Sequence, residues 1–222
     1  MFSLSEENYL KTIFHLERSY SAGVSTNAIA EELETKASSV SDMVKKLSEK
    51  KLVNYKKYQG VKLSERGKNA AVEVIRRHRL WEYFLVEKLH FNWDEVHEVA
   101  EELEHIKSEK LIEELDRFLD YPTRDPHGDP IPDQEGNFAK TTRILLSECK
   151  EGETAVVIGV KDSSASFLRY LDRNKIALGS KIKLLYKENF DQSVIIKTLE
   201  GEFNLSKKTA SNLFVKTEEN EI

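Results

Sequence analysis

Two histidines and two glutamates recur at helical spacing near the middle of the chain, in the segment VHEVAEELEHIKSEKL. If residues 96–111 form one helix, a rotation of about 100° per residue gathers four side chains on roughly one quarter of its surface. These are His97, Glu101, Glu104 and His105. First-row divalent ions accept imidazole nitrogen and carboxylate oxygen, so the pattern indicates a metal site. Because glutamate is also a strong helix former, a solvated acidic face is an equal alternative at this point.

A second histidine and glutamate pair, His78 and Glu82, stands four residues apart in the segment 64–89, which is expected to be one long helix. Both residues fall within its apolar stripe. A buried carboxylate without a partner is energetically costly, so Glu82 needs a cation, a donor or a metal nearby. A contact between the His78 and Glu82 side chains within the helix would give the Glu82 carboxylate this partner. A second pair at helical spacing nevertheless favours metal binding over coincidence.

Composition limits the kind of site that can form. The chain has 222 residues, of which 39% are hydrophobic and 33% charged, as expected of one or two soluble domains. Its one cysteine, Cys149, excludes an internal disulfide and a cysteine-rich zinc module, so any metal must be held by oxygen and nitrogen. No run of about 18 apolar residues and no signal peptide pattern are visible. A cytoplasmic location is therefore expected.

Charge is divided along the chain. Residues 36–68 hold ten Lys or Arg against three Asp or Glu, whereas residues 71–135 hold eight against eighteen. The first stretch therefore suits a polyanion and the second a cation.

The basic stretch belongs to a predicted winged helix-turn-helix. Helices are expected at 5–17 and 25–33 and from Ala37 onward, followed by a hairpin around Gly60. The third helix has a buried stripe of Val40, Val44 and Leu47, and its opposite side carries serine, aspartate and lysine. In such a fold this helix enters the major groove of DNA and the hairpin follows the phosphates. A generic helical domain with a basic loop is the alternative.

The second half of the chain changes character. All four prolines lie in YPTRDPHGDPIPDQEGN, which is expected to be an ordered connector. A short helix is expected around 141–149, and alternating segments then predict strands with one helix between the first two. The fold class is mainly α with a β-rich C-terminal domain. The expected domains are residues 1–70, 71–140 and 141–222.

Several segments, taken in order, resemble the diphtheria toxin repressor and manganese transport regulator family of metal-activated bacterial repressors. They are EENYLKTIFHLE, the winged helix, RRHRLWEYFL, VHEVAEELEHIKSE, DPHGDPIP and the C-terminal β-rich domain. The resemblance covers nearly the whole chain. It implies a DNA-binding domain, a helical metal-binding and dimerisation domain and a C-terminal SH3-like (FeoA-like) domain.

The resemblance also implies roles for individual residues. The implied regulatory metal site consists of Asn8, Glu101, Glu104 and His105, and the implied ancillary site of His78, Glu82 and His97. The DNA-facing candidates are Ser38, Ser39, Ser41, Asp42 and Lys45 on the third helix, with Lys56 and Lys57 on the wing.

Three departures from the family pattern affect the metal sites. Asn8 stands where iron-type members usually have Met and manganese-type members Asp. Lys11 replaces an acid that manganese-type members use for a paired-metal site, and a protonated ammonium cannot bind metal. The family's C-terminal metal contacts would fall near Ser163 and Ser166, which are weaker ligands, and the neighbouring Asp162 could substitute.

The favoured interpretation is a homodimeric repressor of metal-ion homeostasis genes that binds an operator in double-stranded DNA. Ligands without a thiolate suit Mn(II), which is narrowly favoured, or Fe(II). Without the ion, Glu101 and Glu104 would repel each other. The alternatives are a metal-independent winged-helix regulator and, more remotely, a metallohydrolase. No catalytic residue and no membrane partner are expected.

Overall fold

The computed structural model describes residues 2–20, 22–56, 59–139 and 142–217. By their internal contacts these residues form two compact units. The first consists of Met1–Trp81, Glu101–Leu115 and Pro132–Asn137, and the second of Glu82–Ala100, Asp116–Ile131 and Phe138–Ile222. No helix among the described residues is long and apolar enough to cross a membrane.

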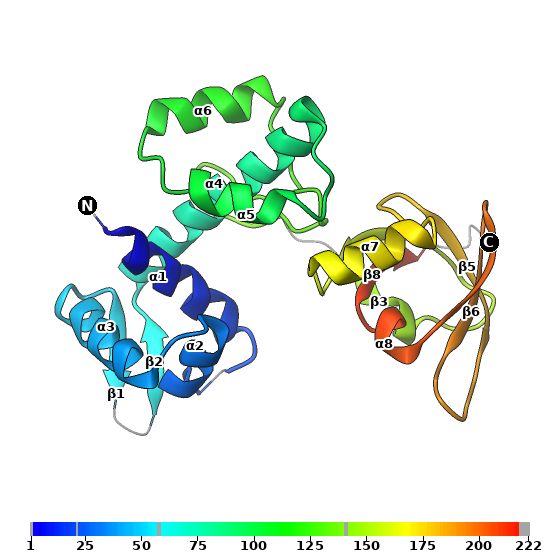
Figure 1. Cartoon of the computed structure of the whole chain (residues 1–222), viewed down its shortest axis with the longest axis horizontal. Helices are drawn as coiled ribbons and strands as arrows, with labels where there is room; N and C mark the ends of the chain where they lie inside the picture. Colours follow the sequence, from blue (N-terminus) through cyan, green and yellow to red (C-terminus); the bar gives the residue numbers. More distant parts are fainter. Residues whose placement is uncertain (1, 21, 57–58, 140–141, 218–222) are drawn as a thin grey trace. The chain divides into compact units, whose positions relative to one another are not determined.

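The winged helix-turn-helix lies in the first unit (Figure 1). Its elements are α1 (Leu4–Glu17), α2 (Thr26–Glu32), α3 (Ala37–Glu49), β1 (Val53–Lys56) and β2 (Gly60–Leu63). Ser25 caps α2 by accepting the backbone N–H of Ala28 at 3.0 Å. Val40, Val44 and Leu47 of α3 are fully buried in a core shared with α1 and the wing. The apolar stripe of α3 therefore directs its serine and lysine side outward.

The wing is a two-stranded antiparallel hairpin in which Val53 pairs with Leu63 and Lys56 with Gly60. Gly60 has a positive φ of 82°, and a Cβ there would lie 2.7 Å from the carbonyl oxygen of Val24. Only glycine fits this close approach, which explains the glycine at the hairpin. Lys57 lies outside the described residues.

One carboxylate connects α1 to α3. Glu6 closes a capping box with Ser3 at the start of α1, and its Oε1 accepts from Lys50 at 2.6 Å and lies 3.0 Å from Lys46. Burial would raise the pKa of Glu6, but hydrogen bonds from Lys50, the Ser3 backbone and Lys46 lower it to about 2. Glu6 is therefore a charged, almost fully buried link between the two helices.

The central helices confirm one prediction and correct another. The long helix is α4 (Glu65–Leu89), close to the expected 64–89. A single helix over 96–111 is wrong, because α5 (Val96–Leu103) ends before Glu104, and α6 (Glu109–Phe118) starts anew. Ser108 caps α6 by accepting the backbone N–H of Leu111. Glu104 and His105 thus lie in a turn after α5, and the helical spacing that first singled them out does not describe them.

The C-terminal domain lies in the second unit and contains a six-stranded antiparallel sheet in the order β3-β8-β4-β5-β6-β7. The strands are β3 (Ile144–Leu145), β4 (Thr154–Val160), β5 (Lys181–Lys187), β6 (Val194–Thr198), β7 (Gly201–Leu205) and β8 (Leu213–Thr217). The helices are η1 (Leu146–Glu148), α7 (Ala165–Arg173) and α8 (Lys207–Ala210). The short helix expected around 141–149 is wrong for the described residues 142–149, which form the strand β3 and the 3₁₀ turn η1. The helix predicted between the first two alternating segments is present as α7, which lies between β4 and β5.

Replacing Glu6 by glutamine should lower the free energy of unfolding by about 1–3 kcal/mol, because the variant loses charge-assisted hydrogen bonds at a buried position. Since the folded-state pKa is about 2 against an ordinary 4.5, this contribution is complete above about pH 4.5 and is lost as the pH falls toward 2. Urea unfolding at pH 7 and pH 3 measures both effects.

A suitable control is Glu65→Gln, which breaks an exposed pair with Lys68 on α4. Its expected cost is below about 0.5 kcal/mol. Equal losses for the two variants would contradict the link between α1 and α3.

Candidate metal centre

Glu104 is the centre of one cluster of ionisable groups in the first unit. Its side chain is 0% exposed, yet Lys11 Nζ donates to both carboxylate oxygens at 2.8 Å and His78 Nδ1 lies 2.6 Å from Oε2. Lys11 also lies 3.3 Å from Oε1 of Glu101, in the last turn of α5. Burial would raise the pKa of Glu104, but the His78 hydrogen bond and the Lys11 charge hold it below its usual value. Glu104 is therefore a buried carboxylate with cationic partners already in place.

His105 is oriented by a carboxylate from α1. Its Nδ1 lies 2.7 Å from Oε2 of Glu7, and its Nε2 lies 3.8 Å from Oε1 of Glu104. A ligating histidine commonly gives its other ring nitrogen to a carboxylate in this way, which fixes the ring and its tautomer. Glu7 was not predicted from the sequence as part of the site.

Asn8 has a buried oxygen that could bind a metal ion. Its Oδ1 is buried and accepts no hydrogen bond from any residue that the structure describes. A buried polar oxygen left in this state is costly unless a cation, ion or water satisfies it. The first ligand set, which we define as Asn8, Glu101, Glu104 and His105, therefore fits a divalent cation chemically.

One expectation about this set is wrong. Glu101 and Glu104 do not face each other uncompensated, because the Lys11 ammonium lies within 3.3 Å of both carboxylates. The sequence identified Lys11 only as a residue that cannot bind metal. Its position as a shared partner of both acids follows from the packing of α1.

A second cluster forms in the second unit around Glu82 of α4. Its Oε1 lies 3.4 Å from His97 Nδ1 on α5, and its Oε2 lies 3.5 Å from His127 Nδ1. Glu82, Asp125 and His127 are all buried, and one ligand atom from each lies within 4.8 Å of the others. We define these three residues as the second ligand set. His78 precedes Glu82 by one turn on the same face of α4.

The proline-rich segment positions the two ligands that were not predicted. Asp125 Oδ1 accepts the backbone N–H groups of His127 and Asp129, both at 2.9 Å, so one tight loop fixes acid and imidazole together. Gly128 has a φ of 85°, and a Cβ there would lie 2.1 Å from the carbonyl oxygen of Ile158. The sequence predicts DPHG as part of a connector and of a family motif, but it assigns no metal ligand there. An acid and a histidine two residues apart, in a loop fixed by proline and glycine, was the signal that could have revealed them.

His127 has the orientation of a metal ligand. Its Nε2 lies 2.8 Å from the backbone oxygen of Trp93, which leaves Nδ1 toward Glu82. Burial would lower the pKa of His127, but Glu82 and Asp125 raise it to about 9. A proton thus balances Glu82 when no metal is bound, and a metal ligated by Nδ1 would take the place of that proton.

The C-terminal residues considered as metal contacts lie at the start of α7. Asp162 Oδ1 accepts the backbone N–H of Ser164 at 2.9 Å, and Ser163 and Ser166 are exposed. A metal contact from them remains a prediction.

The DNA-facing candidates lie on the outer surface of the winged helix. Ser38, Ser39, Asp42 and Lys45 are exposed on α3, Ser41 is half-buried, and Lys56 is exposed on β1. Lys45 lies 3.6 Å from Asp42, in a weak exposed pair that a phosphate could replace.

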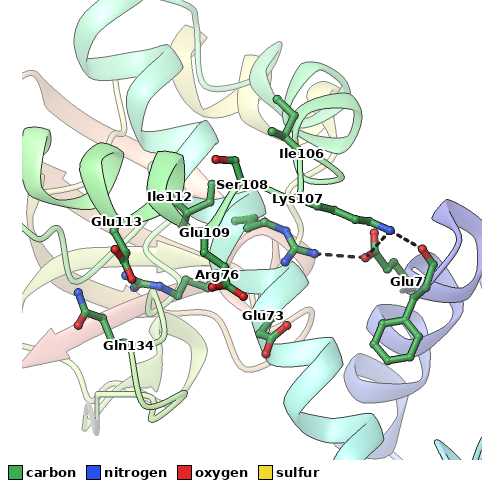
Figure 2. A pocket seen from close by; sticks show the side chains of 12 residues that line it. Glu7, Glu73, Arg76, Ile106, Lys107, Ser108, Glu109, Ile112, Glu113 and Gln134 are labelled. Atoms are coloured by element: carbon green, nitrogen blue, oxygen red, sulfur yellow. Dashed lines mark hydrogen bonds and ion pairs between the residues drawn. The ribbon is translucent and has the colours of Figure 1, made fainter.

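A cavity of about 570 Å³ lies beside the first cluster in the first unit. In Figure 2, Lys107 reaches toward Glu7, and Arg76, Glu73 and Glu109 line the neighbouring wall. Arg77 and Lys107 each approach Oε1 of Glu7 to 3.5 Å. Water and ions can therefore reach the outer edge of the cluster.

Comparison with known proteins identifies the family. Residues 1–61 match the iron-dependent repressor N-terminal DNA-binding domain, residues 64–133 its metal-binding and dimerisation domain, and residues 144–217 the FeoA domain. The iron-dependent repressor IdeR of Mycobacterium leprae (strain TN) is 31% identical over 159 residues, which cover 68% of this chain and 69% of that protein. The chain belongs to the iron-dependent repressor family of transcriptional regulators.

Solved structures of this repressor family agree. A manganese-dependent transcriptional repressor in complex with manganese matches with a TM-score of 0.85 and 36% identity, covering 96% of this chain and 100% of that one. The manganese regulator SloR matches with a TM-score of 0.76 and 32% identity over 96% and 98% of the two chains. The predicted fold class, including the SH3-like domain, is confirmed, as is the expectation of a repressor rather than an enzyme.

Replacing His127 by alanine should weaken one Mn(II)-binding step by at least about tenfold, because even outer-shell partners of metal ligands contribute 10- to 100-fold. Equilibrium dialysis of the intact chain measures Mn(II) binding to the two ligand sets as separate steps. His90→Asn is a control that removes an exposed histidine while tolerating the positive φ of 59° at that position. Unchanged binding by the His127 variant would remove this residue from the ligands.

Proposed function

We propose that this chain is a homodimeric repressor of metal-ion homeostasis genes, activated by Mn(II) or Fe(II). The donors of both ligand sets are oxygen and imidazole nitrogen, with no thiolate, and this composition suits these two ions. Mn(II) is narrowly preferred of the two, because the similarity to a manganese-dependent repressor spans nearly the whole chain. The protein would act in the cytoplasm, on double-stranded DNA.

The observation that carries this proposal is the position of α1 between the recognition helix and the first ligand set. One turn of α1 holds Glu6, which binds lysines of α3, and Glu7, which orients His105. Asn8 follows directly, with its buried unsatisfied oxygen. A divalent cation would join ligands of α1 to those that follow α5. These α1 residues would thereby transmit the occupancy of the site to α3.

Three functional parts accompany this proposal, with boundaries at residues 1–70, 71–140 and 141–222. The matched ranges of the family models support this division. Dimerisation would use the helices between about residues 91 and 119, where Leu111 and Phe118 lie exposed seven residues apart on α6. A two-fold dimer would present two recognition helices to two half-sites.

His105→Ala should remove the gain in operator affinity on adding Mn(II), because the variant loses a ligand that Glu7 holds in position. Typical coupling energies of about 1–3 kcal/mol correspond to a gain of roughly 5- to 150-fold in the parent. Fluorescence anisotropy with labelled operator, with and without Mn(II), measures the gain. His90→Asn should keep it.

The same assay separates the second candidate function, a metal-independent winged-helix regulator. Parent protein that binds operator equally in Mn(II) and in chelator would support that candidate and refute metal activation.

Lys45→Ala and Lys56→Ala should each weaken DNA binding and reduce the slope of log affinity against log salt by about 0.9, as expected for one lost phosphate contact. Ser39→Ala should instead change the preference among operator sequences. Measurement at four salt concentrations gives the slopes. Slopes equal to that of the parent for both lysine variants would place the DNA surface elsewhere.

A further inference from the structure

Lys11 occupies the position between two acids that a bound cation would be expected to take. Its side chain is 13% exposed, whereas that of Glu101 is 50% exposed and that of Glu104 is 0% exposed. Both oxygens of Glu104 accept from its ammonium at 2.8 Å, and Glu101 lies 3.3 Å away. Lys11 also follows Asn8 by three residues on α1, which places the two on neighbouring positions of one helix face. The ammonium therefore reaches both acids from the same helix face that carries Asn8.

Cations already lie against the acids at this position. The acids are Glu7, Glu101 and Glu104, and the permanent cations in contact with them are Lys11, Arg77 and Lys107. Arg77 Nε also donates to the backbone oxygen of Glu104 at 2.5 Å. A divalent ion that enters this cluster meets repulsion from these cations, and the repulsion is strong in a partly buried setting.

We propose that Lys11 is an internal counter-ion that competes with divalent cations for Glu101 and Glu104, and so sets the metal concentration at which the first ligand set fills. This inference rests on the proposed function and adds to it the residue that determines its threshold. Glu82 of the second ligand set is contacted by the imidazoles of His97 and His127, which can themselves act as ligands. The second ligand set therefore fills at lower metal concentration than the first.

The test replaces Lys11 by glutamine, which keeps a long polar side chain and removes the charge. Mn(II) binding to the intact protein is measured by isothermal titration calorimetry with a competing chelator. The expected result is that the weaker of two binding steps tightens at least about tenfold and the stronger step changes little. Lys197→Gln removes one charge from an exposed position on β6 and should change neither step by more than about twofold.

Lys11→Arg provides a second test that does not depend on how well the glutamine variant folds. A guanidinium keeps the charge and can hold both oxygens of a carboxylate, so the weaker step should stay unchanged or weaken. An arginine variant that binds Mn(II) more tightly than the parent would overturn the proposal. An unchanged weaker step in a folded Lys11→Gln protein would also overturn it.

These outcomes are distinct from failure of the proposed function. A parent protein that binds neither Mn(II) nor Fe(II) would refute metal activation itself. If the parent protein binds Mn(II) in two steps and neither step changes in the Lys11 variants, only the role of this residue is refuted.

Discussion

The burial of two glutamates is the constraint on which the rest of the structure depends. Glu104 and Glu82 are 0% and 2% exposed, and a carboxylate removed from water must be paired with a cation or with donors. Glu104 meets Lys11 and His78, whereas Glu82 meets His97 and His127. Two different solutions to one electrostatic problem are thus built into the same chain, because a lysine ammonium contacts Glu104 whereas two imidazoles contact Glu82.

Helix α1 gives this constraint its functional consequence. In its first turns, Glu6 contacts the recognition helix, Glu7 contacts His105 and Lys11 contacts Glu104. A change in the partners of Glu104 therefore acts on the same short helix that supports α3. The strength of this coupling is set by the difference in metal affinity between the competent and incompetent arrangements, and by nothing else.

The sequence predicted the winged helix and α4 closely, because their apolar stripes, caps and the wing glycine are local signals. It also identified most metal-ligand candidates through a family resemblance. The prediction of one helix over residues 96–111 failed at Glu104 and His105. Helix α5 ends at Leu103, and Ser108 caps a new helix. The partners Glu7 and Lys11 are about 90 or more residues from the acids and histidine they contact, so no local period could reveal them. Asp125 and His127 were hidden for another reason, since a loop has no period to read.

Anomalous diffraction from crystals grown with a single equivalent of Mn(II) per chain shows which of the two buried glutamates the metal ion reaches first. The carboxylates of Glu82 and Glu104 compete for one ion, and Lys11 already forms an ion pair with Glu104. We expect an anomalous peak bounded by Glu82, Asp125 and His127, with Lys11 still in contact with Glu104. A first peak beside Glu104, with the second ligand set vacant and Lys11 displaced, would contradict it.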